Sequence, residues 1–185
     1  SEDHLDRYKS IEEYYSAKVN IIRNLTSNSL FIYNEKNEKR FYKYLDKVKT
    51  IQFGLNSKNS NYSYNKENYT IDDNKTREAV IDINEVKLEG NHNIENILAA
   101  INIADYFKID INTIKLAIKN FKPLNHRMEK IYSDKNIDFI NDSKATNTHS
   151  TNKAIYSSNK ATILILGGHS KGKTNYMELF NASFK

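Results

Sequence analysis

The sequence contains no cysteine and no tryptophan, and it has only one proline and five glycines among its 185 residues. The absence of cysteine excludes disulfide bonds, thiolate zinc sites and a cysteine nucleophile. No run of about 18 apolar residues occurs, and the start of the chain lacks a basic segment followed by an apolar one. We therefore expect a soluble, cytoplasmic protein with no membrane partner.

Charged residues are plentiful but mixed in sign. The chain has 28 Lys and Arg residues against 23 Asp and Glu, which gives a formal net charge of +5. It is also rich in Asn (26), Lys (23) and Ile (22), so a single surface lysine or asparagine carries little information. Because the lysines alternate with acids and form no block of about five or six, we expect a solvated surface and no nucleic-acid partner.

The first third of the chain has the order of a βαβ unit. Apolar residues at helical spacing predict a helix over residues 11–25. A short strand near residues 29–33, a helix over 38–47 and a strand ending at Gly54 follow it. Strand, helix and strand in this order favour a parallel sheet.

The next stretch, residues 56–75, is almost wholly polar. Ile71 is its one aliphatic residue, so we expect exposed hairpins or a mobile excursion here. Alternating apolar residues over 80–88 then predict one or two strands, which Gly90 ends.

The single proline separates two parts of the chain. A helix is predicted from Asn91 to Phe107, and a second helix, capped by Asp110 or Asn112, ends before Pro123. The stretch KPLNHR after it is typical of a linker. The predicted organisation is a first domain over residues 1–122, a hinge over 123–128 and a second domain over 129–185.

The second part predicts the opening of another α/β domain. It contains the strands EKIYS and IDFIND, a helix over residues 148–157 and the apolar strand ATILILGG. One βαβ crossover cannot cover both faces of a parallel sheet. We therefore expect the chain to be a segment of a longer protein.

The glycine-rich stretch GGHSKGKT, Gly167–Thr174, fits the pattern of a phosphate-binding loop after a strand. In such a loop Lys173 would reach the outer phosphate and Thr174 would hold magnesium. The stretch comes late in the chain, and Gly-Lys pairs arise easily in a lysine-rich sequence. A nucleotide-binding module built on this loop is the alternative hypothesis for the function.

A second polar cluster, INDSKATNT at residues 140–148, follows a predicted strand. Ligands of open α/β sheets bind beyond the carboxyl ends of the strands, which favours a binding role. The simpler alternative is a helix N-cap, which needs only one residue of the cluster. The short polar or charged residues concerned are Asp142, Ser143, Lys144, Thr146 and Asn147.

Three further residues or pairs are candidates. Asn93 and Asn96 lie one helical turn apart, and their amides offer the paired donor and acceptor that a purine edge requires, although capping explains them equally well. Arg127, beside His126 in the linker, either clamps phosphate or lies on the surface. Lys18 lies on the apolar stripe of its helix, where a lysine either extends to solvent or is buried with a nucleophilic amine.

Taken in order, these motifs resemble one family, the Mur ligases, in its D-glutamate-adding branch. The matching motifs are SEDHLDRY, the helix with SAK, GNHNIENILAA, LNHRME, FINDSKATN and LILGGHSKG. The resemblance covers nearly the whole chain except residues 56–75. It implies an α/β fold: the back part of a central parallel-sheet Mur ligase ATPase domain, then the first βαβ of a Rossmann-like C-terminal domain.

The resemblance also implies a reaction and a set of roles. An ATP-dependent ligase of this branch joins D-glutamate to UDP-N-acetylmuramoyl-L-alanine through an acyl phosphate, in peptidoglycan synthesis. By similarity, the residues that bind the nucleotide are Asn93, Asn96, Arg127 and Asp142. Those near the phosphates and D-glutamate are Lys144, Thr146 and Lys171, and those near Mg²⁺ are His4 and Lys18, the latter carbamylated by CO2.

The chain departs from the family pattern in what it lacks. The family's own phosphate loop, its uridine-binding N-terminal domain and its last C-terminal strands have no counterpart here. On this reading Lys171 matters and Lys173 does not, and the 185 residues alone are expected to be inactive.

Overall fold

The computed structural model describes residues 8–46, 48–158, 160–168, 176–177 and 179. By the density of contacts the chain divides into two compact units. One is Tyr15–Lys122, and the other is made of Ser1–Tyr14 and Pro123–Lys185. Within the described residues, no helix is both long enough and apolar enough to cross a membrane.

The first helix is shorter than the apolar spacing predicts. Helix α1 (Ile11–Val19) passes into a 3-10 turn, η1 (Asn20–Ile22), in place of continuing to residue 25. The tighter 3-10 winding breaks the helical spacing of the predicted stripe. Tyr14 and Ile22 are buried, whereas Ile21 is exposed, so the stripe is interrupted at that residue.

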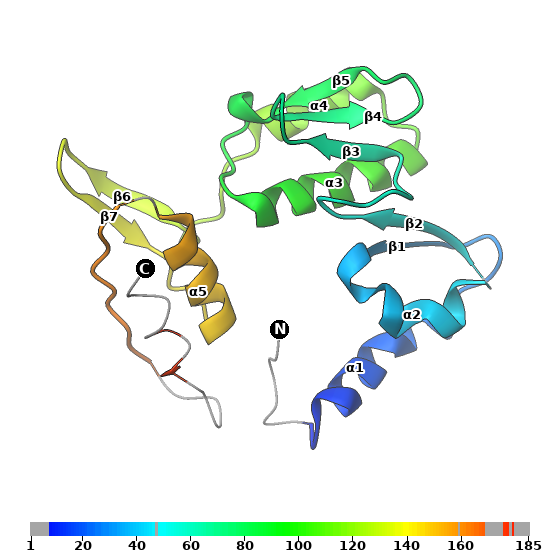
Figure 1. Ribbon diagram of the computed structural model, residues 1–185, viewed down its shortest axis with the longest axis horizontal. Coiled ribbons are helices and arrows are strands. Elements are labelled where there is room, and N and C mark those ends of the chain that lie inside the picture. Colours follow the sequence, from blue (N-terminus) through cyan, green and yellow to red (C-terminus); the bar gives the residue numbers. More distant parts are fainter. Residues whose placement is uncertain (1–7, 47, 159, 169–175, 178, 180–185) are drawn as a thin grey trace. The chain divides into compact units, whose positions relative to one another are not determined.

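The predicted βαβ unit is confirmed. Strand β1 (Leu30–Asn34) is followed by the 3-10 turn η2 (Glu35–Asn37), helix α2 (Glu38–Leu45) and strand β2 (Lys49–Phe53). The two strands pair in parallel, with Leu30 opposite Lys49 and Asn34 opposite Phe53. Their carboxyl ends therefore lie side by side at one edge of the sheet (Figure 1).

The polar stretch 56–75 forms a hairpin, which is one of the two predicted alternatives, but the hairpin is not exposed throughout. It forms strands β3 (Tyr62–Asn65) and β4 (Thr70–Asp73), which join β5 (Ala79–Asp82) in an antiparallel sheet of order β3-β4-β5. The 3-10 turn η3 (Ile83–Glu85) follows β5. Ile71 is fully buried and Tyr62 nearly so, because alternate residues of a strand face the core even when their neighbours are polar.

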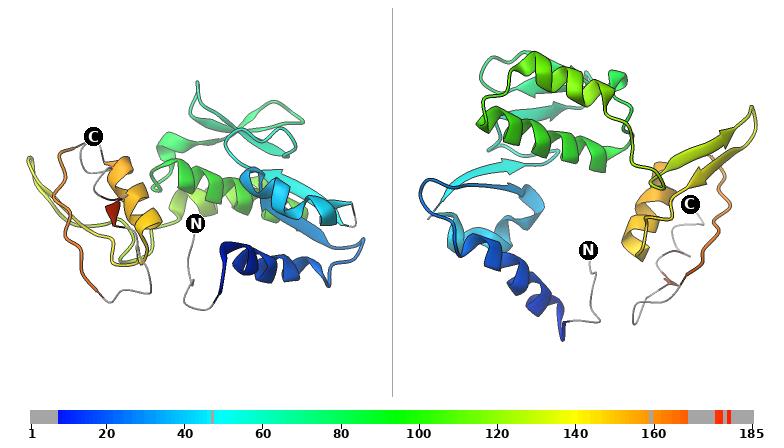
Figure 2. Two further views of the ribbon diagram at one scale, coloured as in Figure 1. Left: turned by 60° about the horizontal axis from the view of Figure 1, so that its bottom comes forward. Right: turned by 180° about the vertical axis from the view of Figure 1, so that it is seen from behind.

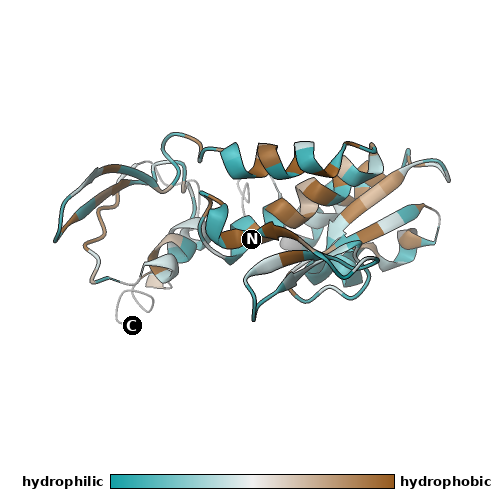
Figure 3. Cartoon of the chain, turned by 90° about the horizontal axis from the view of Figure 1, so that it is seen from above, coloured by the Kyte–Doolittle hydropathy of each residue, from teal (hydrophilic) through white to brown (hydrophobic). Residues whose placement is uncertain are grey.

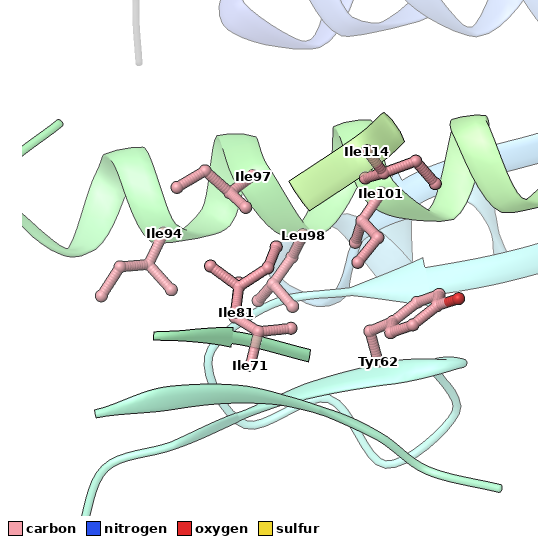
Figure 4. Close-up of a cluster of buried hydrophobic side chains, with 8 residues drawn as sticks. All are labelled: Tyr62, Ile71, Ile81, Ile94, Ile97, Leu98, Ile101 and Ile114. Atoms are coloured by element: carbon pink, nitrogen blue, oxygen red, sulfur yellow. The ribbon is translucent and has the colours of Figure 1, made fainter. Parts of the chain in front are cut away.

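Two helices supply the other half of this core. Helix α3 (Asn91–Tyr106) packs against β1, β2 and β3, and α4 (Ile111–Asn120) packs against α3 and β5 (Figures 1 and 2). Apolar and polar residues alternate along both helices, as the hydropathy colours of Figure 3 show. The buried side chains of the helices and of the sheet pack together in one cluster (Figure 4). Its members are Tyr62, Ile71, Ile81, Ile94, Ile97, Leu98, Ile101 and Ile114.

The unit that contains Pro123–Lys185 is built on a hairpin. Strands β6 (Glu129–Ser133) and β7 (Asp138–Asn141) pair antiparallel with an irregularity after Lys130, and helix α5 (Thr148–Ser157) follows. The α/β class is confirmed, but the strand predicted for ATILILGG is wrong: residues 161–168 adopt no regular structure. No described strand pairs with this backbone, and Ile163 and Ile165 are more than 90% exposed.

Candidate functional site

The predicted site residues fall on both units. Asn93 and Asn96 lie in α3, and Lys18 lies in the last turn of α1. Those near the linker and the end of β7 are Arg127, Asp142, Lys144 and Thr146. His4 and Lys171 lie outside the described residues, as do Lys173 and Thr174 of the alternative phosphate loop.

The structure brings the amides of Asn93 and Asn96 together. Nδ2 of Asn96 donates to Oδ1 of Asn93 at 3.3 Å, and Nδ2 of Asn93 donates to the carbonyl of Glu89 at 2.7 Å. Asn93 is half-buried and Asn96 is exposed. Asn93 thus anchors the pair to the segment before the helix, and the side-chain amide of Asn96 is exposed to solvent.

Backbone geometry at Gly90 starts this helix. Gly90 has φ 89°, a left-handed conformation that strains any residue with a side chain. Its carbonyl accepts the amide hydrogens of Asn93 and Ile94 at 2.9 and 3.3 Å. No side chain caps the helix at this position. The turn that carries the asparagine pair is therefore set by a glycine.

The same turn is tied to the carboxyl edge of the β1–β2 sheet. Nζ of Lys36, just after β1, lies 2.5 Å from Oε1 of Glu95. At this edge Oε1 of Glu35 also accepts the amide hydrogen of Asn56 at 3.2 Å, which joins the segments after β1 and β2. Ligands of open α/β sheets bind at such edges, so the asparagine pair is connected to an edge where a ligand site is expected.

In the other unit, Asp142 fastens the linker to the end of β7. Its Oδ1 accepts the amide hydrogen of Met128 at 3.0 Å. Met128 has φ 47° and His126 has φ 65°, so two non-glycine residues adopt left-handed conformations close together. Such residues cost about 1–3 kcal/mol each and persist only where hydrogen bonds hold them. The half-buried carboxylate of Asp142 is one of those partners.

His126 makes further contacts at this junction. Its carbonyl accepts the amide hydrogen of Lys144 at 3.0 Å, and its own amide donates to Oε2 of Glu129 at 2.8 Å. The amide of Asn141 lies 2.8 Å from Nδ1 of His126. The linker and the end of β7 thus form one hydrogen-bonded unit. This unit fixes the backbone positions from which the side chains of Arg127 and Lys144 extend.

The predicted site residues of this junction differ in exposure. Arg127, Lys144 and Thr146 are exposed, and Asp142 is half-buried. The cap reading of the polar cluster is confirmed for one residue, since Oδ1 of Asn147 accepts the amide hydrogen of Ser150 at 2.9 Å at the start of α5. Capping therefore accounts for Asn147, and the hydrogen bond from Met128 accounts for Asp142.

Lys18 is exposed, which matches the solvent-directed alternative for this lysine. Within the described residues, no group of three or more His, Cys, Asp or Glu side chains could hold a metal ion. Of the two predicted magnesium ligands only Lys18 is described. The residues on view therefore do not by themselves make a magnesium site.

Among the described acid–base groups outside the predicted set, Tyr62 and Asp138 have large pKa shifts. Burial, with the nearby Asp105 and Asp73 carboxylates, raises the pKa of Tyr62 to about 12. Hydrogen bonds from Lys160 and Ser133 lower the pKa of Asp138 to about 2. Asp138 also lies 2.8 Å from Nζ of Lys160, which anchors the segment after α5 to β7.

Several residues of these two regions escaped the sequence prediction. Lys36 lies outside every motif, whereas Glu95, Asn141 and Glu129 lie inside the stretches GNHNIEN, INDSKATNT and LNHRME but had no predicted role. Their partners are 59 residues away for Lys36 and 15 residues away for Asn141. Only the fold brings such pairs together, so no local pattern could have indicated them.

Comparison with known proteins points to one family. A family model described as the Mur ligase middle domain matches residues 1–104. A curated relative from Clostridioides difficile (strain 630), "UDP-N-acetylmuramoylalanine--D-glutamate ligase", is 39% identical over 99% of this chain and 41% of its own length. One of the same name from Fusobacterium nucleatum is 39% identical over 92% of this chain and 38% of its own.

Solved structures agree on the fold. MurF from Acinetobacter baumannii superposes with a TM-score of 0.62 over 85% of this chain and 35% of its own, at 14% identity. A UDP-N-acetylmuramoyl-L-alanyl-D-glutamate--2,6-diaminopimelate ligase gives 0.58 over 100% of this chain and 40% of its own, at 19% identity. The chain thus spans about two fifths of the length of the relatives it matches.

Proposed function

The chain belongs to the Mur ligase family, and from this membership we propose that it is part of an ATP-dependent ligase that adds D-glutamate to UDP-N-acetylmuramoyl-L-alanine. The observation that carries the proposal is the 39% identity to a D-glutamate ligase over 99% of the chain. The order of motifs from SEDHLDRY to LILGGHSKG supports it. The reaction serves peptidoglycan precursor synthesis in the cytoplasm, where ATP is available.

The proposed reaction has two steps. The carboxylate of UDP-N-acetylmuramoyl-L-alanine attacks the γ-phosphorus of ATP, so that an acyl phosphate forms and ADP leaves. The neutral amine of D-glutamate then attacks the acyl carbon, phosphate leaves, and the amine loses a proton as the amide forms. The residues of this chain would bind and orient two of the reactants, the nucleotide of the first step and the amino acid of the second.

The domain organisation is proposed to follow the linker. Residues 1–122 would be the back part of the central ATP-binding domain, 123–128 the hinge, and 129–185 the start of the glutamate-binding domain. The hydrogen bonds of Met128 and Lys144 to the opposite segment support a defined attachment of the hinge to β7. A hinge here would let the two substrate sites meet and exclude water.

Nucleotide binding is assigned to four residues. The Asn93–Asn96 amide pair would face the adenine and the phosphates, because the exposed Asn96 amide offers a donor and an acceptor together. Arg127 would lie on the nucleotide phosphates, for which its planar guanidinium is suited. Asp142 would accept hydrogen bonds from the ribose hydroxyls through Oδ2, since Oδ1 already accepts the amide hydrogen of Met128.

Binding of the incoming amino acid is assigned to the second domain. Lys144 and Thr146, both exposed, would face the phosphate end and D-glutamate. Lys171 would pair with a carboxylate of D-glutamate together with Thr146. On this proposal the GGHSKGKT stretch is not a phosphate loop, and Lys173 has no part in the reaction.

Magnesium and the modified lysine rest on the family alone. His4 and a carbamylated Lys18 would contribute to the metal region, because Mg²⁺ prefers oxygen ligands to an ammonium. Bound Mg²⁺ would neutralise charge on the phosphates. We propose that Lys18→Ala abolishes ligase activity and that a short-chain carboxylic acid restores part of it, since the acid replaces the lost carbamate. Activity unchanged in Lys18→Ala would remove the carbamate from the proposal.

The deciding experiment uses the full-length protein that contains these residues. It is supplied with magnesium, ATP, UDP-N-acetylmuramoyl-L-alanine and either D- or L-glutamate, and ADP release is followed. We expect release that requires the D isomer. Release that is indifferent to the amino acid would instead favour the alternative, a nucleotide-binding module that uses Gly167–Thr174.

A further inference from the structure

The ion pair between Lys36 and Glu95 joins two elements that are distant in the sequence. Nζ of Lys36 and Oε1 of Glu95 are 2.5 Å apart, and 59 residues separate them. The Lys36 side chain is 65% exposed, whereas that of Glu95 is only 14% exposed. The pair therefore lies partly under the surface, where screening by water is weaker than for an open ion pair.

Both partners are held in place by their own elements. Asn34, the last residue of β1, accepts the amide hydrogen of Lys36 through Oδ1 at 3.0 Å and so caps η2. Glu95 lies between Asn93 and Asn96 in the first turns of α3. Because the backbone of a helical turn moves as one body, a contact that fixes Glu95 also fixes the two asparagines.

The start of α3 has few other directional contacts. Its N-terminus carries no side-chain cap. Ile94, Ile97 and Leu98 of the same turns are buried in the core, but apolar contact is non-directional and tolerates small shifts along the helix axis. The hydrogen bond of Asn93 to Glu89 reaches only the adjacent segment. Among the side-chain contacts described above for this turn, the Lys36–Glu95 pair is the one that connects it to the edge of the β1–β2 sheet.

We propose that Lys36 and Glu95 are positioning residues that hold the Asn93–Asn96 amide pair in place for the nucleotide. This inference rests on the proposed function in one respect, namely that the asparagine pair binds ATP. Lys36 acts through Glu95 and does not itself touch the ligand. Loss of the pair loosens the turn, so that ATP binds less tightly while bound ATP reacts at the same rate.

The test measures the KM for ATP and kcat from ADP release by the full-length protein. Lys36→Met and Glu95→Gln each remove one charge and keep the length of the side chain. We expect either change to raise the KM for ATP about fivefold with kcat and the KM for D-glutamate unchanged, because a small misplacement of a binding group weakens its contacts. The exchanged pair, Lys36→Glu with Glu95→Lys, should restore the KM to within about twofold, as expected for two residues that act only on each other.

A second ion pair of the same unit provides a matched control. Lys119 and Glu85 lie 3.1 Å apart with both side chains more than half exposed, and neither residue lies in α3. Lys119→Met therefore removes the same charge without touching α3 near Asn93. We expect it to leave the KM for ATP unchanged.

Each outcome decides the question. A normal KM in both single variants overturns the inference, and so does a raised KM that the exchanged pair fails to restore, since the two residues would then not act only on each other. If ADP release in the unmodified protein is indifferent to D-glutamate, the proposed function fails, but the KM for ATP still tests the pair. A protein that binds no ATP at all overturns both.

Discussion

Replacement of Asp142 by alanine removes the acceptor of the Met128 amide hydrogen, a hydrogen bond of 3.0 Å to a half-buried carboxylate. Bonds to charged groups contribute about 1.5–3 kcal/mol when buried, and partial exposure reduces this to about 1–2 kcal/mol. Met128, with φ 47°, then relaxes from its left-handed conformation. If the linker must keep this shape for Arg127 to meet the nucleotide, the KM for ATP should rise about 5- to 30-fold.

Asp142→Asn separates the two roles assigned to this carboxylate. The asparagine keeps an oxygen that can accept from Met128, but it replaces Oδ2 by an NH2 group that cannot accept the ribose hydroxyls. If Asp142 serves both the linker and the nucleotide, the asparagine variant should have a KM for ATP between those of the unmodified protein and Asp142→Ala. The assay is D-glutamate-dependent ADP release by the full-length protein at varied ATP, with thermal unfolding as a check on folding.

Two results would refute this reasoning. If Asp142→Ala leaves the KM for ATP unchanged, neither the linker contact nor the ribose contact contributes to binding. If Asp142→Asn is as active as the unmodified protein while Asp142→Ala is impaired, Asp142 acts on the linker alone and its nucleotide role is wrong.

Three more predictions concern other parts of the chain. Ile71→Ala should lower the free energy of unfolding by about 3 kcal/mol in urea titrations followed by circular dichroism, because the side chain is fully buried, whereas the exposed Leu116→Ala should change it by less than about 0.5 kcal/mol. The raised pKa of Tyr62 means that the folded state holds this proton more tightly, so its contribution to stability is complete below pH 10 and lost between pH 10 and about 12; Tyr62→Phe should remove that part of the alkaline loss. Lys171→Ala should raise the KM for D-glutamate sharply in the full-length protein while Lys173→Ala changes little, and the reverse pattern, with lost ATP affinity, would favour the phosphate loop.

Much of the fold could be predicted because its signals are local. The spacing of Ile94, Ile97, Leu98 and Ile101 predicts α3 and its buried face, and Asp110 caps α4 as expected, with Thr113 donating its amide hydrogen to Oδ2 at 3.0 Å. The parallel pairing of β1 and β2 follows from the order of strand, helix and strand. In each case neighbouring residues decide the outcome.

The errors fall where burial or pairing depends on distant segments. Ile71 lies among polar residues, and only the packing of α3 over the β3-β4-β5 sheet buries it. The stretch ATILILGG has the composition of a strand, yet a strand needs a partner for its backbone hydrogen bonds, and none of the described strands provides one. Composition indicates the propensity of such a segment but not its surroundings.

The candidate site divides in the same way. The sequence by itself selected the candidate residues, because motifs such as NHNIEN and NDSKATN are contiguous and can be read without the fold. Only the tertiary structure decided that Asn93 and Asn96 bond to each other, that Lys36 reaches Glu95, and that Asp142 holds the linker. The physical reason is that ion pairs and hydrogen bonds act over a few ångströms, so their partners are chosen by the path of the folded chain and not by its order.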